Sequence, residues 1–139
     1  TIKHMTPQGG NLQTWAYREA PYVFYRQGTY YFMWSVDDTG SPNYHVCYGT
    51  SKSPLGDIKI DEQNYRVIEQ VPGEVIYGTA HNSVLQIPGK HEWYIVYHRI
   101  NKNYLKRQPG IHREVCIDKM TFDKKGNIVP VKPSLLFTK

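Results

Sequence analysis

The sequence predicts an all-β fold built from repeated antiparallel units of the β-propeller type. Aromatic residues make up 14% of the chain, with twelve tyrosines among 139 residues. Many of them fall in alternating runs such as residues 29–34, a pattern typical of strands. No ten-residue window has a helical period. The third and strongest observation is that one order of strands and turns occurs twice.

The two passes of this repeat begin at Glu19 and, 62 residues later, at His81. In the first pass, strands are predicted over residues 22–26, 29–36 and 44–51. In the second pass, strands are predicted over residues 83–87, 92–99 and 111–119. Turn residues between 120–122 and 128–131 predict a closing hairpin after the second pass.

Short strands in sets of about four that recur after roughly sixty residues are typical of propeller blades, whereas a sandwich shows no such longer period. We therefore divide the chain into a leading segment (1–18) that ends a preceding blade or linker, one blade (19–76) and the next blade (77–139). Two to two and a half blades would leave strand edges exposed, which native proteins avoid. The remaining blades are expected in the same polypeptide or in a partner chain.

Charge and composition argue against several other function classes. The net charge is +5, but the basic residues are scattered apart from one loop with Lys102, Lys106 and Arg107, so no nucleic-acid partner is predicted. The two cysteines make no disulfide framework and have no zinc-site spacing. No apolar run approaches the ~18 residues of a membrane span, so no membrane partner is predicted. The sequence starts at Thr1 in mid-pattern with no signal peptide, and localisation is not readable from the termini.

The start of the innermost strand of each blade lies near the axis of a propeller, and the repeat places Glu19 and His81 there. Glu19 precedes an aromatic strand and is close in sequence to Trp15. Apolar rings disfavour an ionised carboxylate, which suits Glu19 to donate a proton near neutral pH, as the general acid of a glycosidase must. A surface ion pair with Arg18 is the alternative.

His81 and four other residues are candidates for binding sugar or metal. A neutral imidazole such as that of His81 binds a metal or a sugar hydroxyl, although a structural histidine at a strand end is an equal alternative. The planar fork of Arg113 suits sugar hydroxyls, or else a structural carboxylate. The rings of Trp15 and Trp34 suit stacking on sugars, against the alternative that they belong to the core. His98 ends a strand at the same rim and has a similarly divided interpretation.

Four stretches in a fixed order carry a more specific signal across nearly the whole chain. They are residues 18–24 with 28–32, 44–46 with 51–56, 78–84 with 92–99, and 112–114 with 122–128. Together they resemble glycoside hydrolase family 43, whose members are five-bladed β-propellers that cleave arabinose- and xylose-containing polysaccharides with inversion at the anomeric carbon. The resemblance implies that this chain is the C-terminal part of the catalytic propeller.

The resemblance also implies roles for individual residues. Glu19 matches the general acid, which protonates the departing glycosidic oxygen, and Arg113 matches the arginine that contacts sugar in the cleavage subsite. His81 matches the axial histidine that holds a calcium through water, although the glycine, proline, glycine that often precedes it in the family is Gly78-Thr79-Ala80 here. No other cofactor is implied, the partner is an oligo- or polysaccharide, and a secreted or periplasmic location is expected.

The resemblance finally implies what this chain lacks. The general base and the second aspartate of the family lie on earlier blades, and an inverting mechanism needs an acid and a base roughly 6.5–9.5 Å apart. The 139 residues alone are therefore expected to be inactive. Two alternatives are a noncatalytic carbohydrate-binding propeller segment and a structural repeat that pairs its open edge with another copy. The choice between arabinofuranosyl and xylosyl substrates, and between endo and exo action, stays open.

Overall fold

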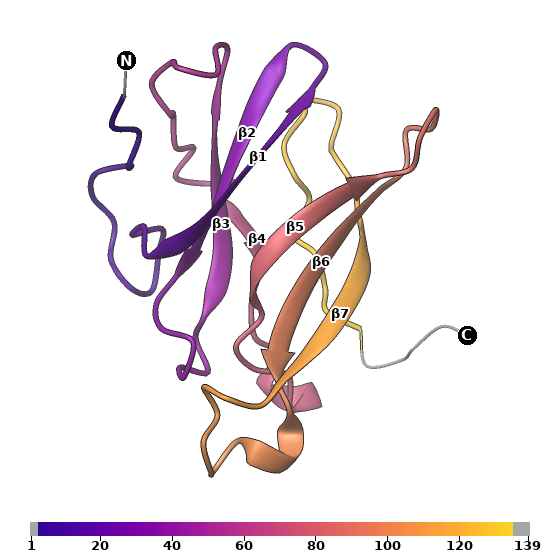
Figure 1. Ribbon diagram of the computed structural model, residues 1–139. Helices are drawn as coiled ribbons and strands as arrows, with labels where there is room; N and C mark the ends of the chain where they lie inside the picture. Colours follow the sequence, from indigo (N-terminus) through magenta and orange to yellow (C-terminus); the bar gives the residue numbers. More distant parts are fainter. Residues whose placement is uncertain (1–2, 135–139) are drawn as a thin grey trace.

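Two antiparallel β-sheets pack against each other in the computed structural model, which describes residues 3–134 (Figure 1). Each sheet is a meander in which neighbouring strands follow one another in the sequence. The first sheet contains β1 (Glu19–Arg26), β2 (Thr29–Val36), β3 (His45–Ser51) and β4 (Arg66–Ile68). The second contains β5 (Ala80–Gln86), β6 (Trp93–Ile100) and β7 (Arg113–Met120), and the connections hold two short 3-10 helices, η1 (Pro72–Glu74) and η2 (Lys102–Tyr104). The predicted all-β fold of repeated antiparallel units is confirmed.

The turn between β1 and β2 follows directly from the sequence. Gln27 and Gly28 both adopt positive φ angles, 47° and 78°. A two-residue turn with two positive φ angles matches the twist of antiparallel strands, and glycine adopts such angles without steric cost. The resulting hairpin pairs Arg26 with Thr29 and fixes the register of the first sheet.

Both inner strands begin with the same irregularity, a β-bulge. The register of β1 shifts just after Glu19, and that of β5 shifts just after Ala80. Ala20 and His81 take left-handed conformations there, with φ of 58° and 55°. The structural equivalent of His81 is therefore Ala20, and the predicted equivalence of Glu19 and His81 is wrong by one residue. The cause is the bulge itself, which re-aims one side chain without a marker in the sequence.

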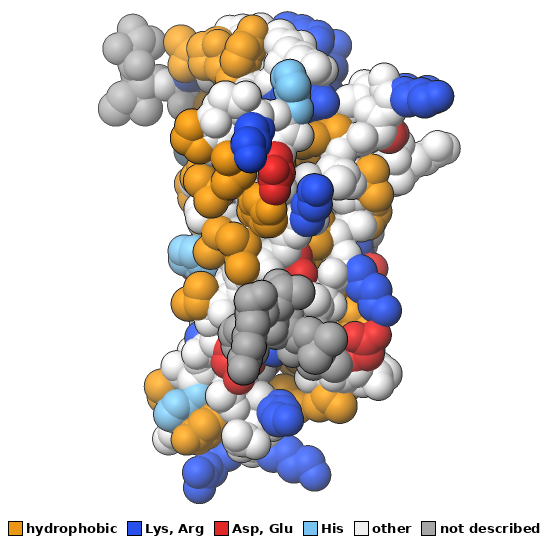
Figure 2. Space-filling view, turned by 90° about the vertical axis from the view of Figure 1, so that its right-hand side faces the viewer, with side chains coloured by type: hydrophobic (Ala, Val, Ile, Leu, Met, Phe, Trp, Pro, Cys, Tyr) orange, Lys and Arg blue, Asp and Glu red, His pale blue; other side chains and the backbone are white. Residues whose placement is uncertain are grey.

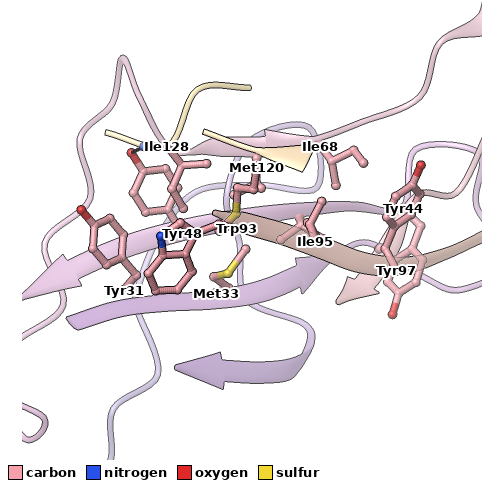
Figure 3. Packing of buried hydrophobic residues seen from close by; sticks show 13 residues of the cluster. Tyr31, Met33, Tyr44, Tyr48, Ile68, Trp93, Ile95, Tyr97, Met120 and Ile128 are labelled. Atoms are coloured by element: carbon pink, nitrogen blue, oxygen red, sulfur yellow. Dashed lines mark hydrogen bonds between the residues drawn. The ribbon is translucent and has the colours of Figure 1, made fainter. Parts of the chain in front are cut away.

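The main core lies between the two sheets (Figure 3). Aromatic packing dominates it, and Phe24 stacks on Tyr31 with ring centroids 4.7 Å apart. Full burial of one such large apolar side chain contributes roughly 1.5–3 kcal/mol. The cluster extends to Tyr44 and Tyr97 at one end, so the two sheets are held together along their whole length. Its buried members are Tyr31, Met33, Tyr44, Val46, Tyr48, Val67, Ile68, Ala80, Trp93, Ile95, Tyr97, Met120 and Ile128.

The outer face of the first sheet is covered by the leading segment of the chain. A second buried cluster contains Trp15, Phe32, Trp34, Val36 and Cys47. The indole N–H of Trp34 donates to the backbone carbonyl of Trp15 at 2.8 Å, which fixes the leading segment against β2. The stretch before Glu19 is thus an integral part of the packed structure.

The second sheet has three strands within the described residues, rather than the four predicted. The predicted closing hairpin forms after β7, with an antiparallel bridge between Phe122 and Ile128 and a hydrogen bond from the amide of Val129 to the carbonyl of Thr121 at 3.0 Å. The amide of Val131 donates instead to the carbonyl of Val67 at 2.7 Å, beside the edge strand β4. Pro130 precedes it and has no amide with which to continue a ladder. The segment around Val131 therefore protects the edge of the first sheet, where the short strand β4 was not predicted.

The outward faces of the two sheets retain exposed apolar side chains. Leu85, Val115 and Ile117 are 44%, 74% and 53% exposed on the second sheet, and Val23 and Tyr25 are 46% and 57% exposed on the first. Figure 2 looks onto the side of the molecule on which β7 lies and shows hydrophobic side chains among charged ones. In a closed propeller each blade packs between two neighbours, which would cover such faces.

The core between the sheets predicts a matched pair of stability effects. Ile95 is fully buried and Ile117 is 53% exposed on the opposite face of the same sheet. We expect Ile95→Ala to lower the free energy of unfolding by about 3 kcal/mol, because it leaves a cavity. Ile117→Ala should cost less than about 1 kcal/mol in this chain. Urea denaturation of the two variants measures both, and equal losses would contradict this packing.

Candidate active site

Side chains from both sheets meet at one end of the inter-sheet core. Tyr44 is fully buried just before β3, and its hydroxyl donates to Oε1 of Glu19 at 2.8 Å. The same hydroxyl lies 3.5 Å from Nδ1 of His81. The ring of His98 is centred 5.9 Å from the ring of Tyr44 and 5.6 Å from that of His81. The sequence analysis named three of these four residues, and the structure brings those three together.

The backbone of the two sheets explains this convergence. Glu19 pairs with Ser35 in the first sheet, and Ala80 pairs with His98 in the second. The bulge after Ala80 turns the amide of His81 toward the first sheet, where it donates to Oγ of Ser35 at 2.9 Å. Strand pairing and one contact between the sheets therefore set the relative positions of the carboxyl and imidazole groups.

Glu19 is oriented by a buried hydroxyl group and not by the neighbouring cation. Arg18 forms its ion pair with Asp38, at 3.4 Å, on the exposed side of the chain. Glu19 is partly exposed, so one end of its carboxyl group is held in the protein while the side chain still reaches solvent. A carboxyl group held in this way can exchange a proton with a bound molecule.

His98 is held in its neutral form. Burial lowers the pKa of His98 to about 4, and the proximity of Arg113 and His81 acts in the same direction, against the opposing effect of Glu19. Its Nδ1 is buried without a hydrogen-bond partner in the described part of the chain. A neutral imidazole beside the carboxyl group can donate or accept a hydrogen bond from a polar ligand.

Arg113 supplies unused donors to the same region. One terminal nitrogen of its guanidinium group donates to the hydroxyl of Thr39. Its Nε and Nη1 atoms are buried and have no partner among residues 3–134. Burial also lowers the pKa of Arg113, although Tyr44 and Asp38 oppose this. Buried donors are normally satisfied, so two donor nitrogens without partners indicate a place where a polar ligand binds.

Comparison with known proteins decides the family. The family model described as glycosyl hydrolases family 43 matches residues 1–128. The chain belongs to glycosyl hydrolase family 43. The resemblance inferred from the sequence is confirmed.

Individual family 43 relatives agree with this assignment. The chain is 38% identical over 131 residues to a β-D-galactofuranosidase of Aspergillus niger, which covers 94% of this chain and 34% of that protein. It is 28% identical over 133 residues to a xylosidase/arabinosidase of Thermoclostridium stercorarium, with 90% and 26% covered. The crystal structure of a thermostable family-43 glycoside hydrolase superposes with a TM-score of 0.75 at 30% identity, over 87% of this chain and 37% of that one. The chain thus spans about a third of the length of these relatives.

Two residues predicted to bind sugar lie elsewhere in this family 43 chain. Trp34 is 1% exposed and Trp15 is 8% exposed, both in the cluster under the leading segment. The indole N–H of Trp15 donates to the carboxylate of Glu62 at 3.1 Å, and the indole N–H of Trp34 donates to the backbone carbonyl of Trp15. A ring face covered by protein cannot stack on a sugar, so the prediction that Trp15 and Trp34 bind substrate is wrong.

Two site residues were missed by sequence reasoning, Tyr44 and Ser35. Both are fully buried, and both contact partners from other strands. Tyr44 is one of twelve tyrosines and precedes an ordinary strand, so nothing local distinguishes it. The only available signal was its place at the start of a stretch that resembles the family.

The described residues do not form a direct metal site. No group of three or more His, Cys, Asp or Glu side chains within residues 3–134 could hold a metal ion. His81 is exposed and its polar neighbour is the Tyr44 hydroxyl, whereas calcium prefers six to eight oxygen ligands.

Within the described residues, no helix is long and apolar enough to cross a membrane.

The lowered pKa of His98 predicts a pH-dependent stability. A histidine in the unfolded chain titrates near about 6.5. Between that pH and about 4 the unfolded state binds more protons than the folded state, so the free energy of unfolding rises with pH. The contribution of neutral His98 to the free energy of unfolding is complete above the pKa of the unfolded chain and is lost as the pH falls toward the folded pKa. Urea denaturation between these limits should give a shallower pH slope for His98→Gln, and an unchanged slope would show that His98 is not neutral.

Proposed function

We propose that this chain forms the acid-donating part of the active site of a family 43 glycosidase, with Glu19 as the general acid. The observation that carries the proposal is the Glu19 carboxyl group, held by the buried Tyr44 hydroxyl at 2.8 Å and facing solvent at the start of an inner strand. Family membership supports this role, because the family acts on glycosidic bonds.

The reaction requires a proton at the leaving oxygen and a water on the opposite side of the sugar. In an inverting glycosidase the acid supplies the proton, and a second carboxylate roughly 6.5–9.5 Å away activates the water. Glu19 serves as the acid, and the base and the second aspartate come from the other blades of the propeller. The isolated chain therefore binds sugar weakly at most and does not turn it over.

Sugar hydroxyls supply what the orphaned polar groups of the site require. Arg113 offers two buried donor nitrogens, and His98 offers an unpaired buried nitrogen. His81 is exposed, and its ring is centred 5.6 Å from that of His98. We propose that these three residues bind the sugar whose glycosidic oxygen accepts the proton of Glu19. Hydrogen bonds from fixed donors select among hydroxyl arrangements, because a missing partner leaves a buried donor unpaired.

The substrate class in this proposal is an arabinose- or xylose-containing polysaccharide of plants. The names of two relatives, a β-D-galactofuranosidase and a xylosidase/arabinosidase, support a furanosyl or xylosyl residue at the cleavage subsite. A galactofuranoside has the same five-membered ring type as an arabinofuranoside with one further exocyclic carbon. Aryl arabinofuranosides, xylosides and galactofuranosides therefore form the substrate panel for the kinetic tests.

Other blades of the propeller are the proposed partner of the exposed apolar faces. Val115 and Ile117 on the second sheet, and Val23 and Tyr25 on the first, point outward where neighbouring blades of a ring would pack. Any calcium at the axis would contact this chain only through water on His81, and its other ligands would come from those blades. A secreted or periplasmic location fits an enzyme whose substrates lie outside the cell.

Removal of the acid predicts a loss of rate that depends on the leaving group. In the complete propeller, Glu19→Gln should lower kcat on a nitrophenyl or unsubstituted glycoside by about 10²–10⁴-fold, because the leaving oxygen is no longer protonated. A dinitrophenyl glycoside needs less protonation and should lose much less. Steady-state kinetics on both substrates measure the difference.

The matched control is Glu92→Gln. Glu92 precedes β6, at the opposite end of that strand from His98, and its carboxylate accepts from the hydroxyl of Tyr94. This variant should retain the kinetics of the native enzyme. An equal loss on both leaving groups in Glu19→Gln would show that Glu19 is not the acid, and binding without any turnover would favour a noncatalytic carbohydrate-binding propeller.

A further inference from the structure

A series of buried polar groups connects the second sheet to the carboxyl group of Glu19. The backbone amide of His81 donates to Oγ of Ser35 at 2.9 Å. The hydroxyl of Tyr44, which lies near Ser35, donates to Oε1 of Glu19 at 2.8 Å. Ser35 and Tyr44 are both 0% exposed, so water does not compete for these contacts.

The direction of the contact between Tyr44 and Glu19 follows from the partners of the Tyr44 hydroxyl. A backbone amide can only donate, so Oγ of Ser35 accepts from His81. The Tyr44 hydroxyl has one proton to give. Glu19 is its short partner at 2.8 Å, whereas Nδ1 of His81 lies at 3.5 Å, the outer limit for such a bond.

We propose that Tyr44 is a positioning residue for the general acid, which commits Oε1 of Glu19 to accepting a hydrogen bond and leaves Oε2 as the oxygen that carries the catalytic proton. This inference rests on the proposed function, since it gives a role to Tyr44 only if Glu19 is the acid. A carboxyl group with one oxygen anchored presents the other in a defined direction. Misplacement of a reacting group by about 1 Å can cost 10²-fold in rate.

The surroundings of Tyr44 keep its hydroxyl a donor. The ionisable groups that face it are Glu19 of β1, His81 of β5, His98 of β6 and Arg113 of β7. Burial first, and the hydrogen bond and charge of Glu19 next, raise the pKa of Tyr44 to about 12, against the opposing effects of Ser35 and Arg113. The hydroxyl therefore stays protonated throughout the range in which glycosidases are assayed.

Kinetics of the complete propeller test the positioning role. We expect Tyr44→Phe to lower kcat by about 10–100-fold with KM changed less than about threefold, because the sugar contacts are retained. The alkaline limb of the pH–kcat profile should move to higher pH, because a donated hydrogen bond favours the ionised carboxylate and its loss favours the acid form. A native kcat together with an unmoved alkaline limb would overturn the proposal.

The matched control is Tyr48→Phe. Tyr48 lies on β3, is 3% exposed, has a pKa raised by burial to about 12, and uses its hydroxyl to accept from the amide of Ile128, away from Glu19. Its variant loses the same atom from a buried ring and should leave kcat and the pH profile of the folded enzyme unchanged. A similar shift in Tyr48→Phe would reduce the effect of Tyr44 to general destabilisation and overturn the proposal.

Carbon-13 NMR of the glutamate carboxyl groups provides a measurement that does not depend on activity. The Glu19 resonance, identified by its loss in Glu19→Gln, should titrate at higher pH in Tyr44→Phe than in the native chain, and should not move in Tyr48→Phe. An unchanged midpoint in Tyr44→Phe would overturn the proposal.

The two measurements separate the positioning role from the identity of the acid. If Glu19→Gln retains native kinetics while the carboxyl resonance shifts in Tyr44→Phe, the proposed function fails and the hydrogen bond stands. If Glu19→Gln loses activity and Tyr44→Phe does not, the positioning role fails and the proposed function stands.

Discussion

The packing of the two sheets against each other is the constraint on which the rest of the structure depends. The inter-sheet core ends at Tyr44 and Tyr97, and the polar site begins there (Figure 3). The amide of His81 reaches Ser35 only because the second sheet is docked on the first. Loss of the apolar contact would therefore separate the imidazole groups from the carboxyl group.

The site combines groups whose charged forms are controlled by burial. His98 is kept neutral, and Arg113 has two buried nitrogens without a partner among the described residues. Partial exposure of Glu19 gives its carboxyl group contact with solvent while Tyr44 holds one oxygen. A leaving oxygen that enters this region would meet a proton source, a neutral ring and fixed donors, which together suit the protonation of a glycosidic bond.

The same architecture explains how part of a propeller can be well packed by contacts within itself. The leading segment covers one outer face, and the segment around Val131 protects the edge strand β4. The site lies at the end of only two inner strands, β1 and β5, whereas the groups around a propeller axis come from every blade. Stability is a sum of contacts within and between neighbouring blades, but an acid–base pair needs residues from different blades at a set distance.

The sequence by itself determined the class of fold, the repeat, the family and the position of Glu19 before an inner strand. These features are written in consecutive residues, because the alternation of a strand and the chemistry of a turn are local. The tertiary structure decided which ring faces are covered, and it places Trp15 and Trp34 in the core. It also decided that the amide of Val131 donates to Val67 of β4. It further decided the position of the bulges, which makes Ala20 the structural equivalent of His81, and the contact of Tyr44 with Glu19. These outcomes depend on which distant segments meet, and no pattern within a single strand encodes that.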